Sequence, residues 1–389
     1  MKTTTTDAAA ATLAPLLSLL NLEAVDGRFP DPQALQRAYK KQVRASPADA
    51  SALRAAASAL ATPESRSEYL RAQSDVAQPL ALGHAPTPRG KVQHSCGNGT
   101  SSEAGRCAHG SASLQGRRPT MEDELLLAVP IGGRAHAYGV FDGHGGARAA
   151  RMLPRHLPGA LRKRLAAAGA FSIEQLAAAA FEEIDAAICD RASADGWDDG
   201  STALVAIIEH ESPTSGCTLT LLQVGDCDAV LASALDGGIA DGGYPLVTRH
   251  RPTEAAEAQR LAAVGVVASA TGRVSGLAVS RAFGDVSYKQ GDAPYLIATP
   301  EVATRTLSVA EAANTILILA CDGLWDFVSP AEACAILLRR PPAGAQWTAD
   351  ELRSAALRLA DAALDRGGDD NVSVLVVPLG LAPSIPEVT

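Results

Sequence analysis

A carboxylate and a histidine follow a short apolar run in residues 138–146, which read Tyr-Gly-Val-Phe-Asp-Gly-His-Gly-Gly. Residues 135–141 have the length and composition of a buried strand. Asp142 therefore stands at a strand end, and His144 lies on a glycine-containing loop whose backbone can approach a ligand closely. These positions suit a metal ligand and a proton donor, although Asp-Gly-His also occurs in ordinary turns.

Five further acids stand directly before, directly after or close to the end of other apolar runs: Glu122, Asp123, Asp322, Asp326 and Asp370. The runs are residues 125–129, 316–320 and 372–377. In an antiparallel sheet, the ends of some strands and the starts of their neighbours share one rim. If these strands are antiparallel neighbours, the five acids and Asp142 converge there.

Six acids on one rim would repel one another unless cations neutralise them. Ligation by oxygen atoms, without histidine or cysteine, suits a hard ion such as Mg²⁺ or Mn²⁺. Two such ions at short spacing can bridge a water, lower its pKa and hold a phosphoryl group for in-line attack. Arg118 would bind the phosphate as a bidentate guanidinium, and His144 would protonate the leaving oxygen.

Three of these interpretations have simple structural alternatives, and for His144 the alternative is a structural imidazole. Asp326 follows Asp322 by four residues and could serve only to cap a helix. Arg118 could form a surface ion pair with Glu122 instead of binding phosphate.

These segments, in this order, resemble the metal-dependent serine/threonine phosphatases of the protein phosphatase 2C family. Further matches are Gly-Ser-Thr-Ala at 200–203, Val-Gly-Asp at 224–226, Gly-Arg-Val at 272–274, the run 277–285 and Thr-Pro-Glu-Val at 299–302. The resemblance covers roughly residues 105–380. It implies an α+β fold, a four-layer αββα sandwich of two antiparallel sheets flanked by helices. The implied reaction is hydrolysis of phosphoserine and phosphothreonine in proteins by a metal-bridged water, without a covalent phosphoenzyme.

The resemblance also implies a role for each candidate residue. The implied metal ligands are Asp142, which bridges two ions, the Gly143 carbonyl, Asp322, Asp370, and, directly or through waters, Asp123, Glu122 and Asp326. Arg118 would bind the phosphate and His144 would be the general acid. Asp226, Arg281 and Asp285 are interpreted as structural.

Three segments depart from the usual family pattern. An aspartate that helps hold a third ion usually stands where this chain has Trp197, which argues against a third ion. The usual Gly-Asp-Ser-Arg reads Gly-Asp-Cys-Asp at 225–228, and the usual Asp-His-Lys-Pro reads Arg-His-Arg-Pro at 249–252. The last two changes touch no implied metal or phosphate position, so we expect them to affect substrate choice more than chemistry.

Charge and cysteine content restrict the partners and the compartment. Residues 1–75 hold nine Lys and Arg against eight Asp and Glu, a charge of +1. Because the net charge of the chain is −9, the remaining residues together carry −10. This acidity fits a carboxylate metal site and argues against nucleic-acid binding. The seven cysteines form no Cys-x-x-Cys pair, which favours a reducing cytoplasmic or nuclear setting. Cys321 is interpreted as a buried, inert thiol beside Asp322.

No apolar stretch approaches the length of a membrane span, and residues 1–20 lack the basic start of a signal peptide. The sequence carries no signal for an oligomer, and a monomer is the default expectation.

Residues 1–75 are predicted to form a small helical unit, followed by a flexible linker at 76–104, the catalytic domain at 105–380 and a tail at 381–389. The Ala-Tyr-Lys-Lys at 38–41 and the segment 61–70 weakly resemble a degenerate DnaJ-type (J) domain. That family's His-Pro-Asp is missing, and Ala-Ser-Pro-Ala-Asp stands at 45–49 instead. The alternative is a generic unit for docking proteins. A co-chaperone role for this unit and a catalytically dead scaffold remain the competing hypotheses for the whole chain.

Within the catalytic part, helical spacing of apolar residues predicts helices over 147–168, 173–192, 253–264 and 349–364. Pro154 and Pro158 are expected to break or kink the first of these helices.

Overall fold

The computed structural model describes residues 92–93, 109–166, 172–210, 212, 216–233, 245–290, 295–337 and 347–380. The predicted N-terminal unit, nearly all of the predicted linker and the tail lie outside these residues. The chain divides into two compact units, residues 1–87 with 273–278 and residues 88–272 with 279–389. Every helix and strand named below belongs to the second unit, which is described by itself.

Two five-stranded antiparallel sheets form the centre of this unit. The first sheet has the order β1 (Val92–Gln93), β2 (Gly110–Leu114), β13 (Val372–Pro378), β12 (Thr315–Ala320) and β9 (Asp228–Ser233). The second has the order β11 (Glu301–Leu307), β8 (Cys217–Val224), β7 (Ala203–Glu209), β4 (Ala135–Phe141) and β3 (Glu124–Gly132). A small third sheet joins β10 (Phe283–Gly284), β6 (Gly200–Ser201) and β5 (Gly143–His144).

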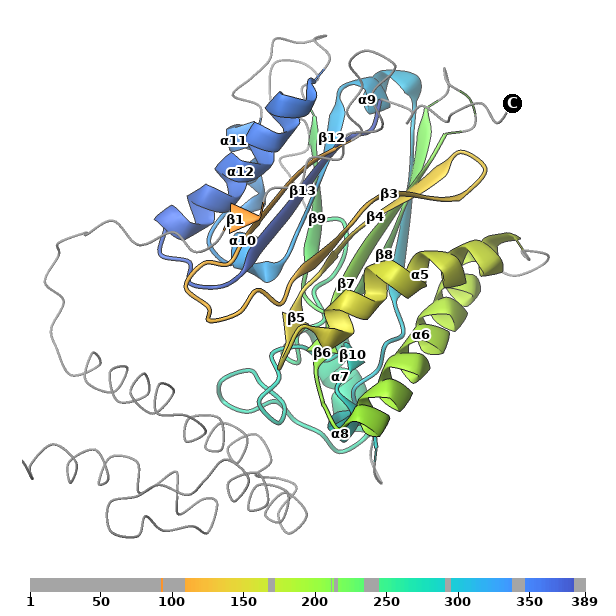
Figure 1. Cartoon of the computed structure of the whole chain (residues 1–389), viewed down its shortest axis with the longest axis vertical. Helices are drawn as coiled ribbons and strands as arrows, with labels where there is room; N and C mark the ends of the chain where they lie inside the picture. Colours follow the sequence, from red (N-terminus) through yellow and green to blue (C-terminus); the bar gives the residue numbers. More distant parts are fainter. Residues whose placement is uncertain are drawn as a thin grey trace, which may run out of the picture. The chain divides into compact units, whose positions relative to one another are not determined.

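Pairs of helices cover the outer faces of the two large sheets (Figure 1). Helices α11 (Pro330–Leu337) and α12 (Ala349–Asp365) lie on the first sheet, and α5 (Arg148–Ala166) and α6 (Ile173–Asp195) lie on the second. The other helices among the described residues are α7 (Ala255–Ala263), α8 (Val286–Lys289), α9 (Val309–Ala313) and α10 (Asp322–Trp325). The αββα sandwich implied by the resemblance is therefore confirmed.

Three apolar cores hold the four layers together. One lies between the first sheet and α11 and α12, and another lies between the second sheet and α5 and α6. The third lies between the two sheets, where β12 and β13 contribute residues such as Leu317 and Leu375, and β4 and β7 contribute Tyr138 and Leu204. Because this inner core packs the two sheets face to face, the ends of their central strands lie at the same rim of the sandwich.

The expected break in the first long helix does not occur. Helix α5 runs without interruption from Arg148 to Ala166 with Pro154 and Pro158 inside it. Each proline removes one helical hydrogen bond, but Leu153, Leu157 and Leu161 are fully buried against the second sheet and α6. Apolar burial on this scale offsets the loss, so tertiary packing overrides the local signal.

Candidate metal centre

The rim of the sandwich carries acids from both sheets. Glu124 at the start of β3 pairs with Phe141 at the end of β4, so Asp123 and Asp142 leave the second sheet side by side. Ala320 at the end of β12 pairs with Val374 near the start of β13, which brings Asp322 and Asp370 to the matching edge of the first sheet. The charges of Asp123, Asp322 and Asp370 all act on Asp142, so the structure brings these four of the six predicted acids together.

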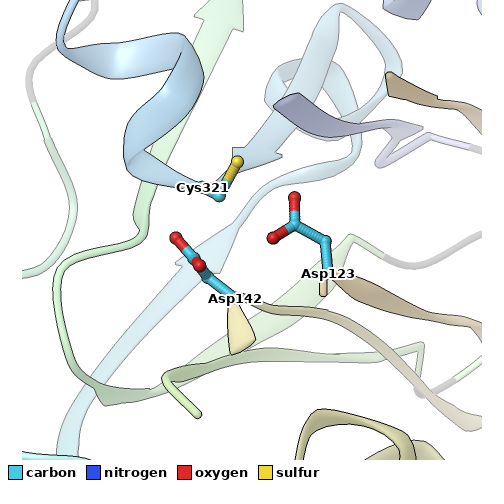
Figure 2. A group of neighbouring side chains, drawn as sticks. All are labelled: Asp123, Asp142 and Cys321. Atoms are coloured by element: carbon cyan, nitrogen blue, oxygen red, sulfur yellow. The ribbon is translucent and has the colours of Figure 1, made fainter. Parts of the chain in front are cut away.

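Asp123 and Asp142 face each other across the buried floor of the cluster, with the sulfur of Cys321 beside them (Figure 2). One carboxylate oxygen of each aspartate and the Cys321 sulfur lie within 4.8 Å of one another. Asp123 is only 6% exposed, and neither of its oxygens has a hydrogen-bond partner of normal geometry among the described residues. Burial, with the nearby charges, raises the pKa of Asp123 to about 7 and holds the pKa of Asp142 well above its usual range.

The Cys321 thiol is buried, as expected from the sequence. It is fully buried, donates to the Asn371 carbonyl at 3.4 Å and accepts from the Ser373 N–H at 3.2 Å. Burial and the neighbouring aspartates raise its pKa well above the ordinary value, which keeps it protonated. The ionisable donors of the cluster are therefore oxygen atoms.

Asp322 and Asp326 stand at the two ends of the single-turn helix α10. Burial and the charges of neighbouring acids raise the pKa of Asp322 to about 7. The Asp326 side chain is more exposed and accepts from Arg249 and Arg251 at 2.8 to 3.1 Å. The Asp326 backbone N–H ends the helix by bonding to the Asp322 carbonyl, and its carboxylate is engaged with arginines instead of capping a helix.

Arg118 lies at the edge of the cluster, on the loop between β2 and β3. Its Nη2 donates to Asp370 Oδ2 at 2.7 Å, so its partner is Asp370 and not Glu122. Burial raises the pKa of Asp370, and the Arg118 charge partly offsets this effect. Asn371 fixes this loop, because its side chain accepts from the Glu122 N–H and donates to the carbonyls of Gln115 and Thr120.

Gly143 and Glu122 are in direct backbone contact. A Cβ added to Gly143 would lie 2.5 Å from the Glu122 carbonyl oxygen, so no other residue fits there without displacing the backbone. The Glu122 side chain accepts from Thr120 Oγ1 at 2.8 Å and from the Gly146 N–H at 3.3 Å. This contact holds the Glu122 segment against the loop that carries Asp142.

His144 has a partner that sequence reasoning missed. Its Nε2 lies 2.6 Å from Oδ2 of Asp285, a fully buried carboxylate in the left-handed backbone region just before α8. Burial by itself lowers the pKa of His144, but the charge of Asp285 and its hydrogen bond outweigh burial, and the pKa is raised. The signal for Asp285 was its place in the matching run 277–285, but nothing in the sequence linked it to a histidine 141 residues away.

Residues 197–199, where the chain departs from the family pattern, have partners in the structure. Trp197 lies under the Arg148 guanidinium, 5.8 Å from its carbon to the ring centroid. Asp199 is buried and accepts from the Arg148 backbone and side chain, while Asp198 binds Ser287.

The carboxylates fit a divalent cation. The two buried oxygen atoms of Asp123 have no hydrogen-bond partner of normal geometry among the described residues, and the pKa values of Asp123, Asp142, Asp322 and Asp370 are all raised. Both features indicate carboxylates whose charged forms a bound cation would stabilise. A set of carboxylate oxygens with a protonated thiol nearby suits a hard ion.

Two facing antiparallel sheets with such a carboxylate rim are the fold and site of a metal-dependent enzyme. A family model described as Protein phosphatase 2C matches residues 107–372. The curated relatives include Probable protein phosphatase 2C 55 of Oryza sativa subsp. japonica, 36% identical over 71% of this chain and 67% of the relative. They also include Probable protein phosphatase 2C 69 of Arabidopsis thaliana, 34% identical over 77% of each chain.

A solved structure described as a phosphatase from a pathogenic strain of Toxoplasma gondii has the same fold, with a TM-score of 0.58 at 22% identity, over 72% of this chain and 96% of that chain. The chain therefore belongs to the protein phosphatase 2C family. It is a metal-dependent protein serine/threonine phosphatase. Among the described residues, no helix is long and apolar enough to cross a membrane.

Proposed function

We propose that the carboxylate rim holds two ions, Mg²⁺ or Mn²⁺, and that water hydrolyses phosphoserine and phosphothreonine in protein substrates there. The observation that carries this proposal is the buried carboxylate of Asp123, which faces Asp142 (Figure 2) and whose oxygens have no hydrogen-bond partner of normal geometry among the described residues. A buried carboxylate without donors is costly unless a cation joins it.

The proposed ligands come from both sheets. Asp142, the Gly143 carbonyl, Asp322 and Asp370 would hold the ions directly, and Asp123, Glu122 and Asp326 would do so directly or through waters. When bound, the ions supply an activated water and neutralise the charge of the phosphoryl oxygens.

The protein's own groups would act on the phosphate and on the leaving oxygen. Arg118, 56% exposed in its side chain, would swing its guanidinium from Asp370 to the phosphate oxygens. Water oxygen forms the new bond to phosphorus as the bond to the Ser or Thr oxygen breaks, and His144 donates a proton to that departing oxygen. Asp285 supports this step, because it orients the imidazole and favours its protonated form.

The five described cysteines are all free thiols, which supports a reducing cytoplasmic or nuclear compartment. Docking of proteins through residues 1–75 stays a prediction, since that unit lies outside the described residues.

The test is phosphate release from a phosphothreonine peptide by the full chain with Mn²⁺, with Mg²⁺ and with EDTA. Asp322→Ala protein is assayed alongside to exclude a contaminating phosphatase. We expect turnover that requires the metal and disappears in the variant. Folded, metal-loaded protein without turnover would instead favour the catalytically dead scaffold, and capture of partners would then be the next experiment.

A further inference from the structure

Two arginines reach the carboxylate rim from the segment between β9 and α7. They are Arg249 and Arg251, and each is anchored on a buried aspartate of the 225–228 turn. Neither was among the predicted site residues. Their side chains are 22% and 29% exposed, so both guanidiniums are largely enclosed by protein.

Arg251 bridges three aspartates. Its Nε donates to Oδ2 of Asp226 at 3.0 Å, and that carboxylate is nearly fully buried. Its Nη2 donates to both oxygens of Asp326 at 3.0 and 3.1 Å and lies 3.5 Å from Oδ2 of Asp322. The buried Asp226 carboxylate thus holds the positive charge of Arg251 beside Asp322, a proposed metal ligand.

Arg249 makes a parallel bridge. Its Nη1 donates to Asp326 at 2.8 Å, and its Nε lies 3.4 Å from Oδ2 of Asp228. The register of the first sheet explains this position, because Asp228 at the start of β9 pairs with Ala320, two residues before Asp322. The acid at 228 and the base at 249, both of which depart from the usual family residues, are therefore partners of each other.

A cation so placed affects the binding of another cation in two ways. Its N–H groups occupy carboxylate oxygens that a metal ion would use, and its charge repels a divalent ion at short range. Both effects lower metal affinity. We propose that Arg251, assisted by Arg249, is a built-in competitor of the divalent ions, which stabilises the metal-free centre and weakens the binding of Mg²⁺ or Mn²⁺. This inference rests on the proposed role of Asp322 as a metal ligand.

The test is titration of the metal-free full chain with MnCl₂ by isothermal titration calorimetry at pH 7.5. Arg251→Gln removes the charge but keeps an amide donor, and we expect it to lower the Kd for Mn²⁺ by about tenfold or more. Arg251→Lys keeps the charge and should stay near the wild-type Kd. Arg249→Gln should lower the Kd by a smaller factor, because Arg249 contacts Asp326 but not Asp322.

Thermal unfolding supplies a second readout. Metal-free Arg251→Gln should melt below the wild type and gain a larger increase in Tm from Mn²⁺, whereas a merely structural arginine would lower both stability and affinity. The matched control is Arg148→Ala, which removes a guanidinium from a buried aspartate, Asp199, outside the proposed ligands. Its Kd should be unchanged.

Tighter Mn²⁺ binding confined to the Arg251→Gln and Arg249→Gln proteins supports the proposal. An unchanged or raised Kd in Arg251→Gln, with normal binding by the wild type, overturns this inference and leaves the proposed function standing. If Arg251→Gln fails to fold, Arg249→Gln decides by the same criterion. Failure of both wild type and variants to bind Mn²⁺ would overturn the metal centre and this inference together.

Discussion

Glu257 is the negative charge at the centre of a buried network that ties α7 to the segments after it. Its Oε1 accepts from Nε and Nη2 of Arg281 at 3.0 and 2.6 Å. Its Oε2 accepts from Nε and Nη2 of Arg260 at 3.1 and 2.8 Å and from the Ser280 hydroxyl at 2.7 Å. Arg260 and Arg281 also donate to the carbonyls of Tyr295 and Thr299, so the network holds three segments together.

The contribution of this network to the free energy of unfolding follows from the pKa of the Glu257 carboxyl. Burial alone would raise the pKa of Glu257, but the hydrogen bonds from Arg281, Arg260 and Ser280 lower it from 4.5 to about 2. That difference corresponds to about 3 kcal/mol of stability at neutral pH, at about 1.4 kcal/mol per pKa unit. Because the folded pKa lies below the unfolded value, the stabilisation is present above pH 4.5 and is lost as the pH falls toward 2.

We therefore expect Glu257→Gln to lower the free energy of unfolding by about 3 kcal/mol at pH 7. The assay is urea unfolding of metal-free protein in EDTA between pH 7 and pH 3.5. About 1.4 kcal/mol of the difference between wild type and variant should disappear over that interval, because the carboxyl of the unfolded chain becomes protonated.

Glu254→Gln is the matched control, since Glu254 is exposed at the N-cap of the same helix and its side chain makes no capping bond. Its unfolding free energy should change by no more than about 0.5 kcal/mol. A loss below about 1 kcal/mol in Glu257→Gln, or a loss that does not depend on pH, would refute the reasoning.

Three other perturbations test the centre. Gly143→Ala should abolish metal-dependent turnover and lower Tm, because its Cβ would lie 2.5 Å from the Glu122 carbonyl oxygen. The control Gly159→Ala adds a Cβ in open space at an exposed helix position and should raise stability by about 0.5–1 kcal/mol. Equal effects of the two substitutions would contradict this reasoning. Metal-free protein should lose Tm as the pH rises from 6 to 8, because the pKa values of Asp123 and Asp322 are raised from 3.8 to about 7 and protonation stabilises the fold below that value. Saturating Mn²⁺ should remove this slope in calorimetry, and a slope that persists would count against these carboxylates as ligands. Asp285→Asn should lower kcat about tenfold or more and lower the pKa of His144 in NMR titration, and an unchanged pKa would show that Asp285 does not act through the imidazole.

The local elements and the position of each acid could be predicted from the sequence. The apolar run 135–141 is β4, and the runs 316–320 and 372–377 lie within β12 and β13. Strands with two buried faces show as continuous apolar runs, and an acid just outside such a run must lie at a strand end. Antiparallel pairing of these strands then predicts that the acids converge at one rim, and the register of β3 with β4 and of β12 with β13 sets which of them lie side by side.

The partners of those acids could not be predicted, because they depend on how distant segments pack. Arg118 bonds to Asp370, 252 residues away, and His144 bonds to Asp285. The anchoring of Arg251 on Asp226 depends on the turn before β9 lying beside the end of β12. Side-chain type and spacing along the chain therefore determined which acids lie at strand ends. The packing of the two sheets through their shared core decided which charges meet there, since Coulomb and hydrogen-bond energies depend on distance in space and not on separation in sequence.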